Sequence, residues 1–416
     1  MIVKDIFIYL SSSILNKAVP FLLLPIMTTY LSPAEYGLLS IYMIFISFTT
    51  AFVGMNMHMN ISKNFFKVSK DDLALYIGNI LYLLMVTLLI YSIVSFGISR
   101  YFDTLFSIPS KWILLLPVIS VFLMLNEINT TVLRNEQRAY MFGVFEVSNT
   151  VLKMSVTIIF LVVLKYSWQS QIFGILISGA IFSIIGIYYL YNRRYIKFQF
   201  DIKNIKSILS ISVPLIPHLL GGVVIAMSDR LFIENMVSIE AVGIYSVGYM
   251  FGMIVLLFID AFIKAWSPWF YKNLAKPTFE KKKKIVFYTY IYIAIIFLLA
   301  IFVSFIAEII LPYFVGDKFV DAQQYILWIS LGYAIQGIYK IFFPYLVHIS
   351  KTGFLAFSTL VAAILNLAFN YVFIKYFGTI GAAYATMLAF GVSAILVFLY
   401  QKKHYPMPWF LKKEIY

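Results

Sequence analysis

Long apolar stretches recur along the whole chain, and they constrain its fold more than any other feature. A helix needs roughly 20 apolar residues to cross the hydrocarbon core of a bilayer, which is about 30 Å thick. The sequence therefore predicts an all-α membrane protein with about twelve transmembrane helices. The predicted spans are residues 7–30, 37–59, 73–99, 112–133, 141–165, 172–192, 208–233, 239–263, 285–310, 323–346, 354–376 and 380–401.

The composition agrees with this layout and excludes several kinds of site. Of the 416 residues, 62% are hydrophobic and 12% are charged, and that charged share is about half that of a soluble domain. Without cysteine, the chain has no disulfide, thiolate metal site or cysteine nucleophile. It contains neither a P-loop nor an HExxH motif, and its four histidines are scattered. We therefore expect transport rather than catalysis, with no metal or organic cofactor.

The basic residues orient the predicted helices. Loops on the side of the two termini hold 22 of the 32 Lys and Arg residues, whereas the opposite loops hold 5. Because basic residues collect in cytoplasmic loops, both termini are expected in the cytoplasm. This distribution also accounts for the net charge of +14 without a nucleic-acid partner. The run Lys281 to Lys284 is interpreted as a contact with anionic lipid. We read residues 1–30 as a retained first helix, since Lys17 interrupts the apolar stretch and no cleavage site follows.

Six predicted spans lie on each side of a basic connection, which indicates two parallel halves. Parallel repeats related by an axis along the membrane normal enclose a cavity and can alternate its access. We expect an N-terminal lobe at 1–195, a cytoplasmic linker at 196–207, a C-terminal lobe at 208–402 and a cytoplasmic tail at 403–416. A shift of 206 residues supports the repeat, because it aligns Ser32, Gly37, Ser40 and Phe45 with Ser238, Gly243, Ser246 and Phe251.

Ionisable residues inside the predicted spans are the main candidates for function. Such a side chain costs about 2.5 to 3.5 kcal/mol at the helix centre, so it should find a partner or face water. Asp260 and Lys264 lie four residues apart, which favours an ion pair within one helix. The adjacent Asp229 and Arg230 point in different directions, so at most one faces a cavity squarely. The full set is Lys17, Glu127, Glu146, Lys153, Asp229, Arg230, Asp260, Lys264 and Lys340.

Two questions about these residues have alternative answers. Glu127 and Glu146 flank a loop that carries two arginines, and they either neutralise those arginines or couple transport to protons. The three basic residues Lys17, Lys153 and Lys340 have no opposite charge within one turn of their own helix. They either line a positive cavity for an anionic substrate or pair with acidic residues of other helices.

The first predicted helix of each half contains prolines. They are Pro20 and Pro25 in the first span, and Pro214 and Pro217 in the seventh. Proline frees backbone carbonyls and permits bending, so we interpret these helices as hinged elements beside the cavity, with static kinks as the alternative. His218 follows directly and is a further cavity candidate. Gly248 and Gly252 form a GxxxG motif, which is typical of close helix packing.

Three segments also match a known pattern. They are ILNKAVPFLLLPIMTTYLSPAEYGLLSIY, SVPLIPHLLGGVVIAMSDRLF followed later by AWSPWFYK, and LNLAFNYVFIKYFGTIGAAYATMLAF. These segments resemble the first, the seventh and eighth, and the last two helices of Wzx-type polysaccharide flippases. Those flippases are part of the multidrug/oligosaccharidyl-lipid/polysaccharide (MOP) superfamily, and the PLIPH and SDR motifs are the most specific part of the match.

The resemblance implies a twelve-helix inner-membrane protein with two six-helix lobes. Such flippases move undecaprenyl-diphosphate-linked oligosaccharide to the outer face through a cationic central cavity, for O-antigen or capsule synthesis. An H+ or Na+ gradient is the expected driving force, and polysaccharide polymerase and chain-length proteins are expected partners. The motifs carry Lys17, Asp229 and Arg230, whereas Lys153, Lys264 and Lys340 rest on position alone. The alternatives are a MATE-like exporter coupled to cations and a membrane enzyme of glycan assembly.

Overall fold

The computed structural model describes residues 21–105 and 107–409, and within these ranges it contains helices and no strand. Clustering of contacts divides the chain into two compact units, Met1–Leu220 and Gly221–Tyr416, which we call unit 1 and unit 2. The helices of unit 1 are α2 (Pro33–Val53), α3 (His58–Asn64), α4 (Lys70–Leu105), α5 (Ser110–Ile113), α6 (Leu116–Asn135), α7 (Ala139–Ile158), the π-helix η1 (Ile159–Val163) and α8 (Gln169–Asn192).

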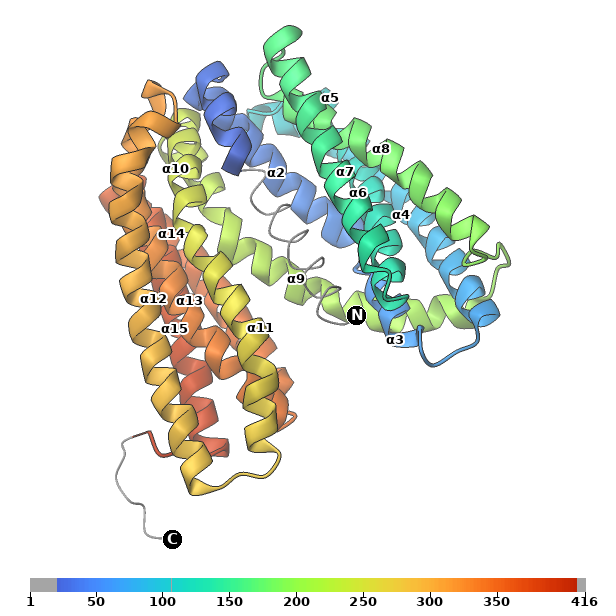
Figure 1. Ribbon diagram of the computed structural model, residues 1–416. Helices are drawn as coiled ribbons and strands as arrows, with labels where there is room; N and C mark the ends of the chain where they lie inside the picture. The colour runs from blue at the N-terminus through green and yellow to red at the C-terminus, as the bar shows by residue number, and fades with distance from the viewer. Residues whose placement is uncertain (1–20, 106, 410–416) are drawn as a thin grey trace. The chain divides into compact units, whose positions relative to one another are not determined.

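A single long helix, α9 (Ile202–Met236), runs through the boundary between the two units (Figure 1). The helices that follow it in unit 2 are α10 (Ile239–Gly252), α11 (Ile254–Leu274), α12 (Phe279–Phe314), the 3-10 helix η2 (Asp317–Ala322), α13 (Gln323–His348), α14 (Thr352–Phe377) and α15 (Ile380–His404).

The predicted membrane layout is confirmed wherever the structure describes the chain. Eleven helical segments are long and apolar enough to span a bilayer, and they correspond to the second to twelfth predicted spans. The largest difference is at the eighth, where α10 and α11 together extend to Leu274 instead of residue 263. Of the first predicted span, the structure describes the helix Phe21–Tyr30. Lys17 and Pro20 lie outside the described residues.

The boundary between the units falls within α9, after the expected linker at 196–207. The first half of α9 belongs to unit 1 because the segment before it is held on α4. The backbone N–H of Lys197 donates to the carbonyl of Ala74 at 3.1 Å, and the Asn79 amide donates to the carbonyl of Gln199 at 3.0 Å. A Cβ at Gly78 of α4 would lie 2.1 Å from the Lys197 carbonyl oxygen, so only glycine permits this approach.

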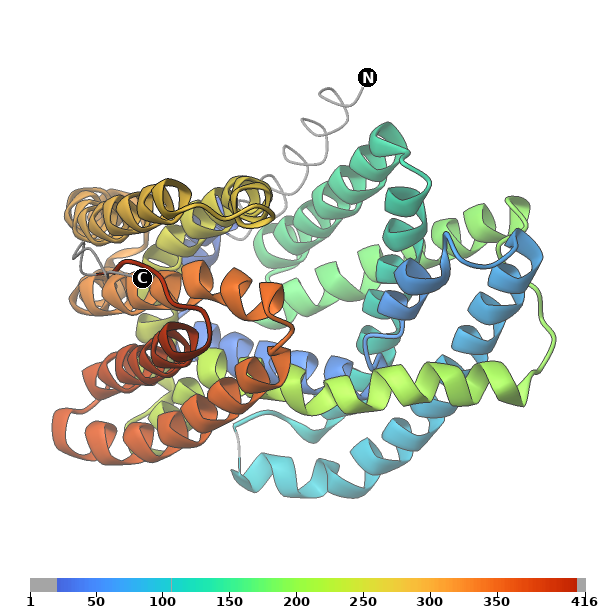
Figure 2. The same cartoon turned by 90° about the horizontal axis from the view of Figure 1, so that it is seen from below.

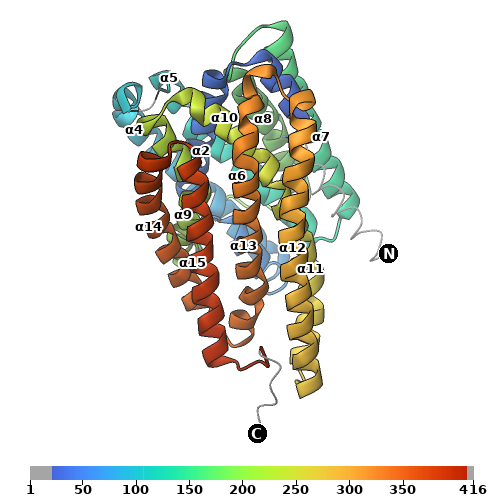
Figure 3. The same cartoon turned by 90° about the vertical axis from the view of Figure 1, so that its left-hand side faces the viewer.

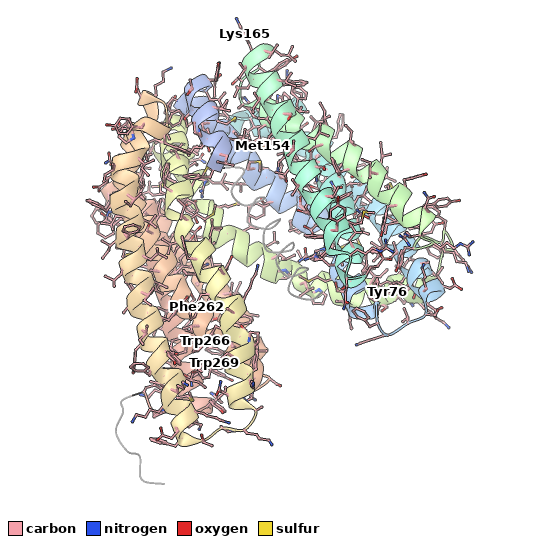
Figure 4. The ribbon with its side chains drawn as sticks, viewed as in Figure 1. Tyr76, Met154, Lys165, Phe262, Trp266 and Trp269 are labelled. Atoms are coloured by element: carbon pink, nitrogen blue, oxygen red, sulfur yellow. The ribbon has the colours of Figure 1, made fainter. Side chains whose placement is uncertain are left out.

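A buried polar chain attaches α9 itself to unit 1. The Asn60 amide of α3 donates to Ser212 Oγ of α9 at 2.8 Å. The hydroxyl of Tyr76 on α4, labelled in Figure 4, donates to Asn60 Oδ1 at 3.2 Å. Asn60 and Ser212 are fully buried, so these bonds are made where unpaired polar groups would be costly. The apolar core around them includes Ile77 and Ile128, both fully buried.

Helix α13 is the centre of unit 2. It packs against α10, α11, α12 and α15, and α14 packs on α15. Figure 3 shows α13 between α12 and α15, and Figure 2 shows the same helices from below as neighbours in one group. Of the four predicted prolines, Pro25, Pro214 and Pro217 are described, and each lies inside a continuous helix. Whether these helices bend during transport stays a prediction.

The close helix packing predicted from the GxxxG motif is confirmed. A Cβ at Gly248 of α10 would lie 2.6 Å from the backbone oxygen of Ala322, where α13 begins. A Cβ at Gly252 would lie 2.6 Å from Ile329 Cγ2. The two glycines therefore allow the backbone of α10 to approach the start of α13.

We expect Gly248→Ala to destabilise unit 2 by about 1 to 3 kcal/mol, the usual cost of overpacking a tight contact. The matched control is Gly222→Ala in α9, where a Cβ would meet nothing within 4 Å. This control should be neutral or stabilising, since alanine favours a helix by up to about 1 kcal/mol over glycine. Unfolding of the purified protein in detergent measures both, and equal effects of the two variants would contradict the prediction.

Candidate functional site

The buried charged site of unit 2 is built around Arg230 on α9. Asp229 and Arg230 are 0% and 7% exposed, and Arg230 Nη1 lies 2.8 Å from Asp229 Oδ1. The same guanidinium nitrogen donates to the carbonyl of Ala226 at 3.0 Å, one turn earlier. The guanidinium therefore folds back along α9, and the two adjacent side chains neutralise each other.

Three tyrosines from two other helices complete this site. The hydroxyl of Tyr245 donates to Asp229 Oδ2 at 2.7 Å. The Arg230 guanidinium lies over the ring of Tyr249, with Cζ 4.1 Å from the ring centroid, as in a cation–π contact. The hydroxyl of Tyr333 on α13 donates to that of Tyr249 at 2.9 Å. We call Asp229, Arg230, Tyr245, Tyr249 and Tyr333 the Arg230 cluster.

The sequence identified the two charges of this cluster but not their pairing or the tyrosines. Adjacent residues start in different directions around a helix, yet the long arginine side chain reaches back to its neighbour. Tyr245 and Tyr249 lie four residues apart on α10, the spacing of one helical face. That spacing was the sequence signal that could have identified these two tyrosines. Tyr333 lies far along the chain, and no sequence signal connects it with the cluster.

A second ion pair connects two helices of unit 2. Lys340 Nζ of α13 lies 2.5 Å from Asp260 Oδ1 of α11, and each side chain is about a quarter exposed, at 28% and 26%. For Lys340, the alternative of interhelical pairing is therefore confirmed. We expected Asp260 to pair with Lys264 on its own helix, but the recorded ion pair joins it to another helix. Lys264 is exposed.

Of the other predicted residues, Glu127, Glu146 and Lys153 are described, and they lie on helices of unit 1. Glu127 lies 3.7 Å from Arg134, with both side chains about half exposed, so Glu127 neutralises an arginine in a pair of small energetic value. Glu146 and Lys153 lie on α7, and Lys153 is half-buried. Lys17 and the His218 side chain lie outside what the structure describes. Their roles stay predictions.

The AWSPWFYK motif builds an aromatic row on α11. Figure 4 shows Phe262, Trp266 and Trp269 following one another along this helix. The rings of Phe262 and Trp266 are 5.7 Å apart, and those of Trp266 and Trp269 are 4.9 Å apart. Phe262 also stacks on Tyr292 of α12 at 4.4 Å. Phe262 precedes the motif, which itself contributes packing between α11 and α12 through Trp269, 5.5 Å from the ring of Tyr288.

Unit 1 has a polar cluster that sequence reasoning missed. Glu136, just after α6, accepts hydrogen bonds from the hydroxyls of Tyr189 at 2.8 Å and Tyr195 at 3.0 Å. Arg138 lies 3.2 Å from the same carboxylate. Burial raises the pKa of Tyr195 to about 12, and the Glu136 carboxylate adds to the rise, so this hydroxyl remains a donor. The cluster fastens the chain after α8 to the end of α6. Within residues 21–105 and 107–409, no three His, Asp or Glu side chains are grouped to hold a metal ion.

Two family models match the chain. The model described as "Polysaccharide biosynthesis protein" matches residues 2–274, and the MatE model matches residues 214–372. A protein of the Lsg locus of Haemophilus influenzae is 27% identical over 395 residues, which cover 91% of this chain and 94% of that protein. A Haloferax volcanii protein named "Probable low-salt glycan biosynthesis flippase" is 23% identical over 195 residues, covering 47% of this chain and 41% of the relative.

The fold is similar to that of a solved transporter. An inward-facing multidrug resistance MATE family transporter of the MOP superfamily matches with a TM-score of 0.69. The sequences are 15% identical, and the match covers 93% of this chain and 94% of the other. This likeness confirms the predicted MATE-like helical fold. Because the first family model covers well over half of the sequence, the chain belongs to the family described as polysaccharide biosynthesis protein.

Proposed function

We propose that this protein is a flippase that moves undecaprenyl-diphosphate-linked oligosaccharide units from the cytoplasmic to the outer face of the bacterial inner membrane. The observation that carries the proposal is the family match over residues 2–274, which include the SDR segment. The relative named as a glycan biosynthesis flippase supports the same activity. Both termini lie in the cytoplasm in this proposal, and the product supplies O-antigen or capsule assembly by polymerase and chain-length proteins.

Arg230 is the residue through which the site would recognise the diphosphate. A guanidinium binds phosphate oxygens in a bidentate manner and stays charged at any physiological pH. In the proposed cycle, the diphosphate takes the place of Asp229 beside Arg230, and the released carboxylate is then free to bind H+ or Na+. Lys17 would supply a second cation, and access to the two faces alternates around the substrate.

The direct test is export in a strain whose only copy carries Lys17→Ala or Arg230→Lys. Each variant should abolish surface polysaccharide while lipid-linked units accumulate inside. Arg230→Lys replaces a planar, bidentate guanidinium with a point charge, and Lys17→Ala removes the proposed second cation. Lys63→Ala, at an exposed position of α3, is the control and should export normally. Normal surface polymer in both test variants, at wild-type protein levels, would sink the proposal.

The match to the MatE model favours a second candidate, export of small molecules coupled to cations. Deleting such an exporter changes susceptibility to cationic drugs but leaves the surface polymer intact. A deletion strain that loses polymer with unchanged drug susceptibility supports the flippase, and the reverse result supports the exporter.

A further inference from the structure

Unit 2 has an apolar groove on the outside of its central helix. The groove has a volume of 410 Å³ and lies among side chains of α12, α13 and α15. Its lining includes Ile335, Ile338 and Phe342 of α13, Tyr290 of α12 and Ile395 of α15. Figure 3 looks onto these helices, with α13 between the other two. A volume of this size falls within the roughly 300 to 1,000 Å³ of ordinary ligand sites.

The chain after α15 contributes to the lining of this groove. Trp409 lines the groove and is 4% exposed, and its backbone carbonyl accepts a hydrogen bond from the Tyr290 hydroxyl. Lys282 Nζ donates to the carbonyl of Pro406 at 3.2 Å. It also lies over the ring of Tyr405, 5.1 Å from the ring centroid and within the limit of about 6 Å for a cation–π contact. The segment that carries Trp409 is therefore held beside the lysine run of α12.

A cationic pocket lies on α12, just before the α12 residues that line the groove. It has a volume of 460 Å³ and is lined by Lys281, Lys283, Lys284, Phe287 and one acid, Glu280. Lysine outnumbers the acid by three to one among these side chains. Lys283, Phe287 and Tyr290 occupy positions i, i+4 and i+7, so the pocket and the groove share one helical face. At 1.5 Å per residue, Lys283 and Tyr290 are about 10 Å apart along the axis.

We propose that the groove and the pocket together bind one anionic phospholipid, with an acyl chain in the groove and the headgroup among Lys281, Lys283 and Lys284. The order along α12 fits, because the headgroup region adjoins the hydrocarbon core of a bilayer, as the lysines adjoin the apolar groove along this helix. The surrounding lipid is as apolar as the groove, so the groove selects an acyl chain by the fit of its shape. The lysines provide the preference for a negatively charged headgroup. The site belongs to unit 2 alone and involves none of the residues assigned to oligosaccharide transport.

The test measures retained lipid on the full-length protein by native mass spectrometry, with phosphatidylglycerol and phosphatidylcholine supplied in equal amounts. Lys283→Gln/Lys284→Gln should lower phosphatidylglycerol affinity about 30-fold and leave phosphatidylcholine unchanged, at about 1 kcal/mol per lysine. Lys282 is kept because it holds the segment before Trp409. Gly391→Leu should reduce both lipids on the order of tenfold by filling the groove. A Cβ at Gly391 meets only Ile335 Cγ2, at an ordinary 3.9 Å.

Matched controls separate this site from general effects. Lys63→Gln/Lys67→Gln removes two exposed lysines from unit 1, and Gly97→Leu adds the same side chain where a Cβ meets nothing within 4 Å. Neither control should change lipid retention. Equal loss of phosphatidylglycerol in both lysine variants would overturn the site in favour of diffuse attraction, and unchanged retention in Gly391→Leu would overturn the groove.

Two further measurements keep the result decisive. Unfolding without added lipid shows whether each variant is folded. If the double lysine variant is not folded, Lys284→Gln alone replaces it, with an expected loss of phosphatidylglycerol affinity of about fivefold. Undecaprenyl phosphate is then added as a competitor. If it displaces phosphatidylglycerol at equal concentration with the same dependence on Gly391, the occupant is the carrier lipid and our assignment is overturned. No glycan is present, so a failure here is separate from a failure of the proposed transport function.

Discussion

Replacing Asp229 with alanine is expected to destabilise unit 2 by about 3 to 5 kcal/mol. The variant leaves the Arg230 guanidinium, 7% exposed, without its carboxylate in a membrane-spanning helix. Removing one partner of a buried ion pair is costly because the other charge remains desolvated. It also removes the acceptor for the Tyr245 hydroxyl. Denaturant unfolding of the purified protein in detergent measures the loss.

A double variant shows whether the unpaired charge is the cause. Asp229→Ala/Arg230→Met removes both charges and should recover most of the stability, since apolar replacement of a buried pair is often neutral. It should nevertheless fail to export polysaccharide, because the proposed diphosphate contact is gone. Glu127→Ala is the matched control, since its pair with Arg134 is about half exposed and should contribute at most about 1 kcal/mol. A double variant as unstable as Asp229→Ala would refute this account.

Replacing Asp260 with alanine is expected to cost about 2 kcal/mol. The change leaves Lys340 uncompensated on α13, and a lysine at the centre of a spanning helix costs about 2.5 to 3.5 kcal/mol. The expected value is lower because both side chains are about a quarter exposed, at 26% and 28%. Unfolding in detergent again provides the measurement.

Reversing the charges tests the pairing directly. Asp260→Lys/Lys340→Asp should restore most of the stability that either single change removes, because the two positions remain adjacent. Lys264→Ala on the same helix as Asp260 is the control, and we expect a change of less than about 0.5 kcal/mol at this exposed position. If the charge-reversed double variant is no more stable than either single variant, Asp260 and Lys340 contribute to stability independently.

The membrane layout was predictable because it depends on local composition. Any stretch of about 20 apolar residues lowers its free energy by forming a helix in lipid, whatever its neighbours are. The second to twelfth spans are therefore found where the sequence placed them. Helix ends were predicted less well: the second span was predicted from residue 37, whereas α2 starts at Pro33, after Ser32, whose side chain exchanges hydrogen bonds with Glu35.

The partners of the buried charges were not predictable in the same way. The sequence showed that Asp229, Arg230, Asp260 and Lys340 need partners, because the energetic cost belongs to each residue. For Asp260, the candidate on its own helix was Lys264, four residues away, whereas pairing of Lys340 with an acidic residue of another helix was left open without naming that residue.

Thus the sequence by itself determined the family, the number and position of the described spans, and which polar groups require compensation. Only the tertiary structure decided that α13 supplies Lys340 to Asp260 and Tyr333 to the Arg230 cluster, and that α9 begins as part of unit 1. The physical reason is that lipid stabilises each helix separately but does not specify its neighbours. Helix neighbours depend on close contacts such as those at Gly78 and Gly248, which join segments far apart in the chain.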